Sequence, residues 1–430
     1  MNINKKIKSH ILSQTVDKND RKIGIEVECF IFTKNFKRIP VNSLNNYSAI
    51  DLLNELNDTS KKTNGVYSIE PGGQIEWSSP PFSNIRNLEK SLYNYKKLIE
   101  GVLKKRDLIP LYMGVDPFHD PDSIDLIEHK KYQLMNSNME KNGVLGKWMM
   151  RNTSSIQVNY DIIDEKDAEE IMFISDCIHP ISAYLFSNSP FQLGESVGDK
   201  NLRNQIWENT DSNRCRSLFD HNIDKSDNLI DLYVEFVARV PGIFQLDDDL
   251  QIQDTDLLLG KQLKKKLIAG KLRKEDIQAA LHQIFTNVRL KSLVEIRDID
   301  CLPFKHILAP VAFLTGLLTE SPIRKRLINE FAKWTPKERL LWNNVALGLD
   351  INQIGPNKRK YFDWVSWVGE ISVEGLQKRD YNEEKYFSEY FQNILKKGSL
   401  CVQTQNEFVA SGKSLEEFIF NDLFCETKDK

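Results

Sequence analysis

The 430-residue chain carries little net charge and has no long hydrophobic run. Lys and Arg number 58 against 61 acidic residues, a formal net charge of −3, which gives no overall attraction to nucleic acid or to an anionic membrane. The longest apolar stretch, Ile307–Leu318, contains a proline and is too short to span a bilayer, so we expect it to form a buried helix. We therefore predict a soluble protein with neither a nucleic-acid nor a membrane partner.

Cysteine is also scarce, and its spacing forms no recognisable motif. The six cysteines include no C-x-x-C pair, which is typical of a protein from a reducing compartment. The first residues, Met1–Lys8, are basic but contain no apolar core, so we predict no secretory signal. A cytoplasmic location is therefore expected.

Several common catalytic motifs are absent. The seven histidines form no H-E-x-x-H or other metal spacing, and there is no G-x-S-x-G. Gly412-Lys413-Ser414 has the ending of a phosphate-binding loop, but Glu407 occupies the position of the required upstream glycine. These absences argue against a zinc peptidase, a serine hydrolase of the G-x-S-x-G type and a P-loop nucleotidase.

What the sequence has instead is a set of strand-like runs that combine apolar residues with acids, amides or arginine. In Arg21–Phe32, alternate residues are apolar and share one face, while Glu26 and Glu28 share the other. Burying two adjacent carboxylates costs several kcal/mol unless a cation lies between them. A divalent metal site is therefore the first hypothesis.

A second acidic run covers Glu70–Trp77. Its Pro71-Gly72-Gly73 segment predicts a turn that brings Glu70 back near Glu76, and its glycines let the backbone approach a ligand closely. Gln74 and Glu76 share one face of this run. The turn would therefore add acidic groups to the same site.

Two further runs supply amides and an arginine. Gln157 and Asn159 share a face of the third run, and Glu295 stands beside Arg297 in the fourth. Acids for Mg²⁺ and an arginine for phosphate oxygens are the usual parts of a phosphoryl-transfer site, and this set suits Mg²⁺ better than zinc. One such run alone is most often a solvent-facing strand, but four together are less easily explained in that way.

The pattern along the chain predicts an α+β fold. Residues 1–302 mix strand-like and helical runs, whereas residues 303–430 are mostly helical. We predict an antiparallel or mixed sheet with surrounding helices and a helical C-terminal part packed on it, as one integrated catalytic domain. The expected strands are Arg21–Phe32, Tyr67–Ser78, Ser154–Asp161 and Ser292–Ile299. The expected helices are Asn84–Leu103, Glu165–Phe186, Leu272–Thr286, Asn382–Lys396 and two that begin after Thr335 and Ser414.

Taken in order, these motifs resemble glutamate–cysteine ligase of the plant and proteobacterial type. The resemblance extends from about Arg21 to about Leu423. It implies a glutamine-synthetase-like catalytic fold whose sheet is lined by acids. The stretches that carry it are Glu70–Glu76 (E-P-G-G-Q-I-E), Gln157–Asn159 (Q-V-N), Trp207–Arg214 and Arg289–Arg297.

The resemblance further implies an ATP-dependent reaction. The γ-carboxylate of L-glutamate would take the γ-phosphoryl group of ATP, and the amine of L-cysteine would then displace phosphate to form γ-glutamylcysteine, the first step of glutathione synthesis. A carboxylate is a poor acyl donor until it is phosphorylated, and metal ions neutralise the anions that gather. The expected cofactor is Mg²⁺, or Mn²⁺ in its place, with ATP as co-substrate.

The resemblance also implies roles for individual residues. Gln157, Asn159 and Arg297 are expected to contact ATP, and Arg297 and Glu295 to be catalytic. Arg214 and Arg203 would hold a substrate carboxylate, because a guanidinium pairs with it through two hydrogen bonds. The expected metal ligands are Glu26, Glu28, Glu70, Glu76 and Glu295.

Departures from the family pattern leave the acceptor amine open. Arg151 stands one position before the arginine that the family often has, and Trp77 follows Glu76 where leucine is usual. A related carboxylate–amine ligase that uses another amine, or another acid, is therefore an alternative. A degenerate nucleotide-binding protein and a structural protein with solvated charged strands are two others, but the retained acids, amides and Arg297 favour an enzyme.

Overall fold

A seven-stranded antiparallel sheet runs through the centre of the structure, a computed structural model that describes residues 2–44, 46–60 and 65–424. The strand order is β10–β11–β5–β1–β3–β2, and β4 pairs with the second half of β1. Two short ribbons, β6–β7 and β8–β9, lie outside this sheet. The strands are β1 (Ile23–Thr33), β2 (Val66–Ile69), β3 (Ile75–Ser78), β4 (Leu108–Leu111), β5 (Ser155–Asp161), β6 (Phe191–Gln192), β7 (Glu195–Ser196), β8 (Phe244–Leu246), β9 (Ile252–Asp254), β10 (Val288–Leu290) and β11 (Leu293–Asp300).

Strand β1 is the centre of the sheet because it pairs with β3, β4 and β5. The predicted alternation along it is confirmed: Ile23, Ile25 and Val27 are buried in the main hydrophobic core. On β3, Ile75 and Trp77 point into the same core. The opposite face of both strands is therefore left for the acidic residues.

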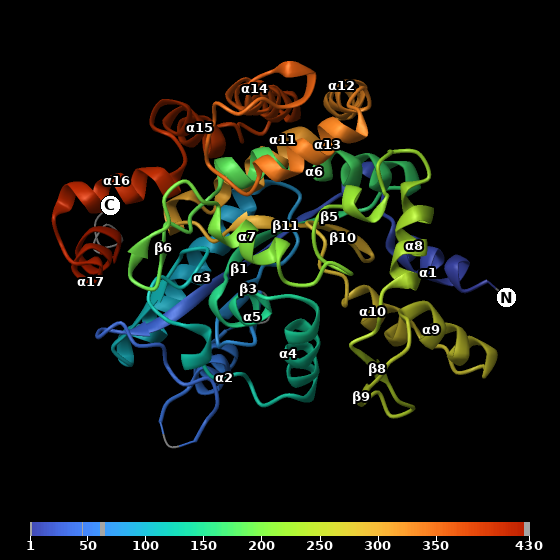
Figure 1. Ribbon diagram of the computed structural model, residues 1–430, viewed down its shortest axis with the longest axis horizontal. Helices are drawn as coiled ribbons and strands as arrows, with labels where there is room; N and C mark the ends of the chain where they lie inside the picture. Colours follow the sequence, from blue (N-terminus) through green and yellow to red (C-terminus); the bar gives the residue numbers. More distant parts are fainter. Residues whose placement is uncertain (1, 45, 61–64, 425–430) are drawn as a thin grey trace.

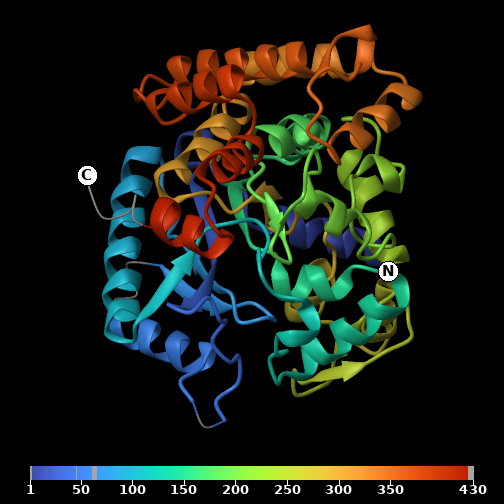
Figure 2. The same cartoon turned by 60° about the vertical axis from the view of Figure 1, so that its left-hand side comes forward.

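Helices cover both faces of the sheet, as Figures 1 and 2 show. On one side lie α6 and the C-terminal helices α11–α15, and on the other lie α4 and α5. The α-helices are α1 (Ile3–Ile11), α2 (Ala49–Thr59), α3 (Ile85–Lys105), α4 (Lys130–Asn142), α5 (Gly146–Asn152), α6 (Glu165–Leu185), α7 (Leu202–Glu208), α8 (Leu229–Arg239), α9 (Leu259–Ile268), α10 (Lys274–Leu281), α11 (Leu308–Leu318), α12 (Ser321–Phe331), α13 (Pro336–Val345), α14 (Tyr361–Arg379), α15 (Lys385–Lys397), α16 (Leu400–Ser411) and α17 (Leu415–Phe418).

Most of the predicted helices are found, and their ends have the expected chemistry. Thr335 and Ser414 form capping boxes at the starts of α13 and α17. The helix expected over Leu272–Thr286 is shorter, because the chain leaves α10 after Leu281 and the Phe285 N–H donates to the carbonyl of Arg214 instead (2.8 Å). The change to helical structure after Leu302 is observed, whereas the domain boundary predicted there stays a prediction.

The apolar helix α11 lies in the core and packs against α3, α6, α14 and α15. Within the described residues, no single helix is long and apolar enough to cross a membrane. The segments Phe304–Leu318 and Ser321–Phe331 meet the length and composition criteria only as a pair, with a bend of 83° between them. The five cysteines of the described part are buried and have free thiols.

Candidate active site

Strand register gathers glutamates on the polar face of the sheet. Glu28 of β1 lies directly opposite Glu76 of β3, and Glu26 of β1 lies opposite Gln157 of β5. Like charges placed directly opposite one another destabilise an antiparallel pair of strands. A cation bound between Glu28 and Glu76 would offset this repulsion.

The turn between β2 and β3 adds a third carboxylate to this pair. Its first residue is Glu70, whose carbonyl accepts from the N–H of Gly73 (2.9 Å), and Gly73 adopts a left-handed φ of +82°. Oxygen atoms of Glu28, Glu70 and Glu76 lie within 4.8 Å of one another. Three carboxylates at this spacing can share one divalent cation that prefers oxygen ligands.

Neighbouring strands orient two of these carboxylates. The Oε2 atom of Glu28 accepts from the Ser155 N–H (2.8 Å), and its Oε1 accepts from the Ser155 hydroxyl (2.9 Å) and the Gln157 amide (3.0 Å). The Oε1 atom of Glu76 accepts from the Ser68 hydroxyl (2.6 Å). Rotation of either carboxylate would break these bonds, so Glu28 and Glu76 are oriented without a ligand.

The acidic cluster, which consists of Glu28, Glu70, Glu76 and the neighbouring Glu26, resists ionisation. Burial, and then the charges of neighbouring glutamates, raise the pKa of Glu26 to about 7 and that of Glu70 to about 8. Burial also raises the pKa values of Glu28 and Glu76. A bound divalent cation favours the ionised form of such groups, because it supplies the missing positive charge.

Glu295 differs from the other acids because it is surrounded by cations. Its Oε2 accepts from Arg289 and lies 3.2 Å from Nη1 of Arg297, and its Oε1 lies 2.7 Å from Nζ of Lys291. Burial alone would raise the pKa of Glu295, but these cations hold it well below its usual range. Glu295 therefore holds Arg289, Lys291 and Arg297 together, and we call these three cations the basic wall. The role of Glu295 as a metal ligand stays a prediction.

Gln157 links the acidic cluster to the cations around Glu295. Its Oε1 accepts from Nη1 of Arg297 (2.5 Å), while its amide nitrogen donates to Glu28. Because one planar amide makes both bonds, the guanidinium of Arg297 and the carboxylate of Glu28 keep a fixed relation. Gln157 therefore lies between the acids and Arg297, and its predicted contact with ATP stays a prediction.

These groups line a cavity of about 270 Å³ between the sheet and helices α4, α5 and α7. Lys131 of α4 and Arg203 of α7 add positive charge, and Trp207 and Phe285 add aromatic surface. Burial and the charge of Arg289 lower the pKa of His282, which also lines the cavity, to about 3, so this imidazole is neutral at physiological pH. The cavity is therefore lined by both carboxylates and cations.

Comparison with known proteins identifies the family. The profile of glutamate–cysteine ligase family 2 matches residues 22–412. The chain belongs to this family. Curated relatives include the chloroplastic glutamate–cysteine ligases of Brassica juncea and Arabidopsis thaliana, each 30% identical to this chain over 325 and 330 residues. These alignments cover 74% and 75% of this chain but 62% of each plant protein, so the chain spans less than two thirds of their length.

Two solved structures share the fold. A glutamate–cysteine ligase from Francisella tularensis, solved in complex with AMP, is similar with a TM-score of 0.64 at 13% identity, over 96% of this chain and 89% of that one. A bifunctional glutathione synthetase from Pasteurella multocida is similar with a TM-score of 0.50 at 10% identity, over 96% of this chain and 51% of that one. The predicted α+β architecture is therefore confirmed.

The structure corrects one site residue that the family resemblance predicted. Arg214 is fully buried and does not line the cavity. Its Nε donates to Asp211 (2.7 Å), its Nη1 to the Gln283 carbonyl (3.2 Å) and its Nη2 to the Pro241 carbonyl (2.6 Å). Because Arg214 is fully buried away from the cavity, it does not reach a substrate carboxylate there, and it instead fixes the chain that leads to Phe285.

Two other predicted residues have clear positions. Arg203 lines the cavity, donates from Nη2 to the Arg297 carbonyl (3.1 Å), and has a buried Nε with no partner among the described residues. Asn159 does not line the cavity, and its amide donates to Oε1 of Glu26 (3.1 Å). Contact between Asn159 and ATP therefore stays a prediction, and its observed contact orients Glu26.

Sequence reasoning assigns no role to several residues that line the cavity. Lys131 and Tyr132 lie in an amphipathic helix whose polar face looks solvent-exposed in the sequence, and only the packing of α4 against the sheet reveals their position. Met149 and Met150 are both buried, and both also line the cavity. No local signal distinguishes these residues from ordinary surface or core positions.

Proposed function

We propose that this chain is an ATP-dependent ligase that joins the γ-carboxylate of L-glutamate to the amine of L-cysteine, giving γ-glutamylcysteine for glutathione synthesis. One observation carries the proposal: carboxylates and cationic side chains line the same cavity in a member of the glutamate–cysteine ligase family. Carboxylates bind the divalent cation that accompanies ATP, and arginine and lysine bind phosphates and carboxylates. Both needs of the reaction are supplied at the same place.

The donor set fits Mg²⁺, or Mn²⁺ in its place. Glu28, Glu70 and Glu76 offer converging oxygen atoms, with Glu26 alongside, and their raised pKa values indicate a deficit of positive charge. When bound, the ion would neutralise the charge that collects among the carboxylate and phosphate oxygens during phosphoryl transfer.

The basic wall would bind the anionic parts of the substrates. Arg297 would contact the transferring phosphoryl group, because Gln157 and Glu295 fix its guanidinium beside the acidic cluster. Arg203 would hold a substrate carboxylate through the nitrogen that has no partner among the described residues, and Lys131 would add a second cation. The similar enzyme from Francisella tularensis was solved in complex with AMP, which supports nucleotide binding by this chain as well.

The proposed reaction has two steps. A γ-carboxylate oxygen of glutamate forms a bond to the γ-phosphorus of ATP while the bond to the ADP oxygen breaks. The amine of cysteine then bonds to the γ-carbonyl carbon and loses a proton, and phosphate leaves with the electrons of the carbon–oxygen bond. Fixed cations around the cavity would stabilise the negative charge that develops in both steps.

The first experiment measures ADP released by the purified full-length chain with ATP, Mg²⁺ and L-glutamate, with and without L-cysteine, and identifies products by mass. Cysteine-dependent ADP together with the mass of γ-glutamylcysteine is the expected result. ADP release that depends on a different amine would select the related carboxylate–amine ligase. Binding of ATP without turnover on any amine would refute a ligase.

A pair of glutamate variants provides the control for that experiment. Glu76→Gln removes one charge from the acidic cluster, whereas Glu235→Gln removes one from the exposed face of α8. Only the first should abolish ADP release.

We also propose a cytoplasmic location, which the free thiols of the described cysteines support and which cell fractionation would test.

A further inference from the structure

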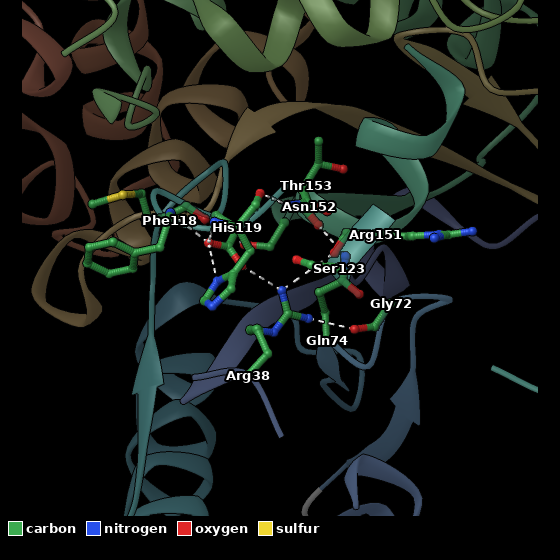
Figure 3. Close-up of polar contacts among 12 residues, drawn as sticks. Arg38, Gly72, Gln74, Phe118, His119, Ser123, Arg151, Asn152 and Thr153 are labelled. Carbon is green, nitrogen blue, oxygen red and sulfur yellow. Dashed lines mark hydrogen bonds and ion pairs between the residues drawn. The ribbon is translucent and has the colours of Figure 1, made fainter. Parts of the chain in front are cut away.

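The turn that carries Glu70 is held from behind by a buried arginine outside the cavity. Arg38 comes after a different turn, the one that follows β1, and forms an isolated bridge with Phe32. Its Nη2 donates to the carbonyl of Gly72 (2.6 Å), and its side chain is only 5% exposed. Figure 3 shows this contact and the groups around it.

Gly72 leaves no room for the turn to move toward its neighbour. A Cβ atom at Gly72 would lie 2.5 Å from Cα of Arg151, so the turn packs directly on the end of α5. Arg38 lies on the same side, with Nη1 3.5 Å from the Arg151 carbonyl. The backbone of the turn is therefore held by close packing and by two hydrogen bonds from outside it, from Arg38 to the Gly72 carbonyl and from the Ile127 N–H to the Pro71 carbonyl (2.9 Å).

Arg38 is itself anchored by a buried carboxylate. Its Nη1 donates to Oδ2 of Asp116 (3.0 Å), whose side chain is fully buried. Oδ1 of Asp116 accepts from the N–H groups of Phe118 (2.9 Å) and His119 (3.1 Å), and the His119 ring lies 3.1 Å away. Figure 3 labels Arg38, Phe118 and His119, three of the residues that bond to this carboxylate.

The guanidinium of Arg38 also lies over the ring of Phe30. Cζ of Arg38 lies 4.8 Å from the centroid of that ring, within the range of a cation–π contact. The fork of Arg38 can therefore reach Asp116 with one nitrogen and Gly72 with another, which a lysine ammonium on a flexible stem cannot do in the same geometry. Neither Arg38 nor Asp116 lines the cavity.

We propose that Arg38 is a positioning residue for the metal-binding carboxylates, because it holds the Glu70 turn in the position where Glu70 converges with Glu28 and Glu76. This inference rests on the proposed function, since it assumes that these carboxylates bind a divalent cation. Groups that orient metal ligands without touching the metal typically contribute about 10- to 100-fold to metal affinity. Arg38 acts on the cluster in the same way, through the backbone of the turn.

The test measures Mn²⁺ binding to the full-length chain by calorimetry, with unfolding temperature measured in parallel. Arg38→Lys keeps a positive charge beside Asp116 but loses the second hydrogen bond, so we expect a folded protein that binds Mn²⁺ about tenfold more weakly. Arg21→Lys is the matched control, because Arg21 is also buried and paired with an aspartate, Asp167, but contacts no part of the turn. It should leave Mn²⁺ affinity unchanged.

Every result of this test has a defined meaning. Arg38→Lys with Mn²⁺ affinity within twofold of the unmodified chain would overturn the proposal. If Arg38→Lys does not fold, Asp116→Asn is read by the same criterion, and failure of both to fold while Arg21→Lys folds would assign the pair to folding and overturn positioning. Absence of Mn²⁺ binding in the unmodified chain would instead refute the metal site of the proposed function.

Discussion

The raised pKa values of the acidic cluster predict that the metal-free protein becomes less stable as the pH rises. Burial and neighbouring charge raise the pKa of Glu70 from its ordinary value of 4.5 to about 8. The folded chain therefore binds more protons than the unfolded chain between these two values. Since stability falls with pH wherever the folded state binds more protons, the loss begins near the lower value and is complete above the higher one.

The size of this loss follows from the pKa shift. One pKa unit corresponds to about 1.4 kcal/mol, so a rise from pH 4.5 to pH 7 would lower the free energy of unfolding by up to about 3.4 kcal/mol through Glu70 alone. Water in the cavity screens this partly exposed carboxylate, and we therefore expect roughly 2 kcal/mol. In a protein of this length that amounts to about 2 °C in the unfolding temperature.

Denaturant titrations at several pH values in EDTA would measure this loss. The wild-type chain should lose roughly 2 kcal/mol relative to Glu70→Gln between pH 4.5 and pH 7, because glutamine does not titrate. Saturating Mg²⁺ should remove the loss, and Glu235→Gln, with its exposed position on α8, should behave as wild type. A difference between wild type and Glu70→Gln that does not change with pH would show that Glu70 does not titrate with a raised pKa in the folded chain.

Three further predictions concern single side chains of the site and its support. Glu76→Gln should lower turnover at least about 100-fold without changing the circular dichroism spectrum, because the proposed metal ligand loses its charge. Wild-type-like turnover would remove Glu76 from the proposed metal set. Arg214→Ala should lower the free energy of unfolding by about 3 to 5 kcal/mol, because it leaves the buried Asp211 carboxylate without its ion-pair partner. The folded fraction should keep the KM for L-glutamate and for L-cysteine. Unchanged stability with a raised KM would restore the predicted substrate role. Lys131→Met should raise the KM for one anionic substrate about tenfold with little change in kcat, as expected for loss of uniform binding; an unchanged KM for ATP and for glutamate would exclude Lys131 from binding.

Features that depend on residues close in the chain could be predicted from the sequence. The alternation in β1 determined which face carries Glu26 and Glu28, because successive side chains of a strand point to opposite faces. Pro71-Gly72-Gly73 predicted the turn that returns Glu70 to Glu76, because glycine tolerates the positive φ that the turn requires. The capping boxes placed the starts of α13 and α17 for an equally local reason.

The tertiary structure alone decided which charged groups face the cavity. Arg203 and Arg214 are both arginines in or just after α7, yet Arg203 lines the cavity while Arg214 is bonded to Asp211 and two distant carbonyls. The same holds for Lys131, which lies in a helix that looks solvent-exposed, and for Glu295, whose cations control its ionisation. The position and charge of a side chain depend on burial and on partners far away in the sequence, which no local pattern encodes.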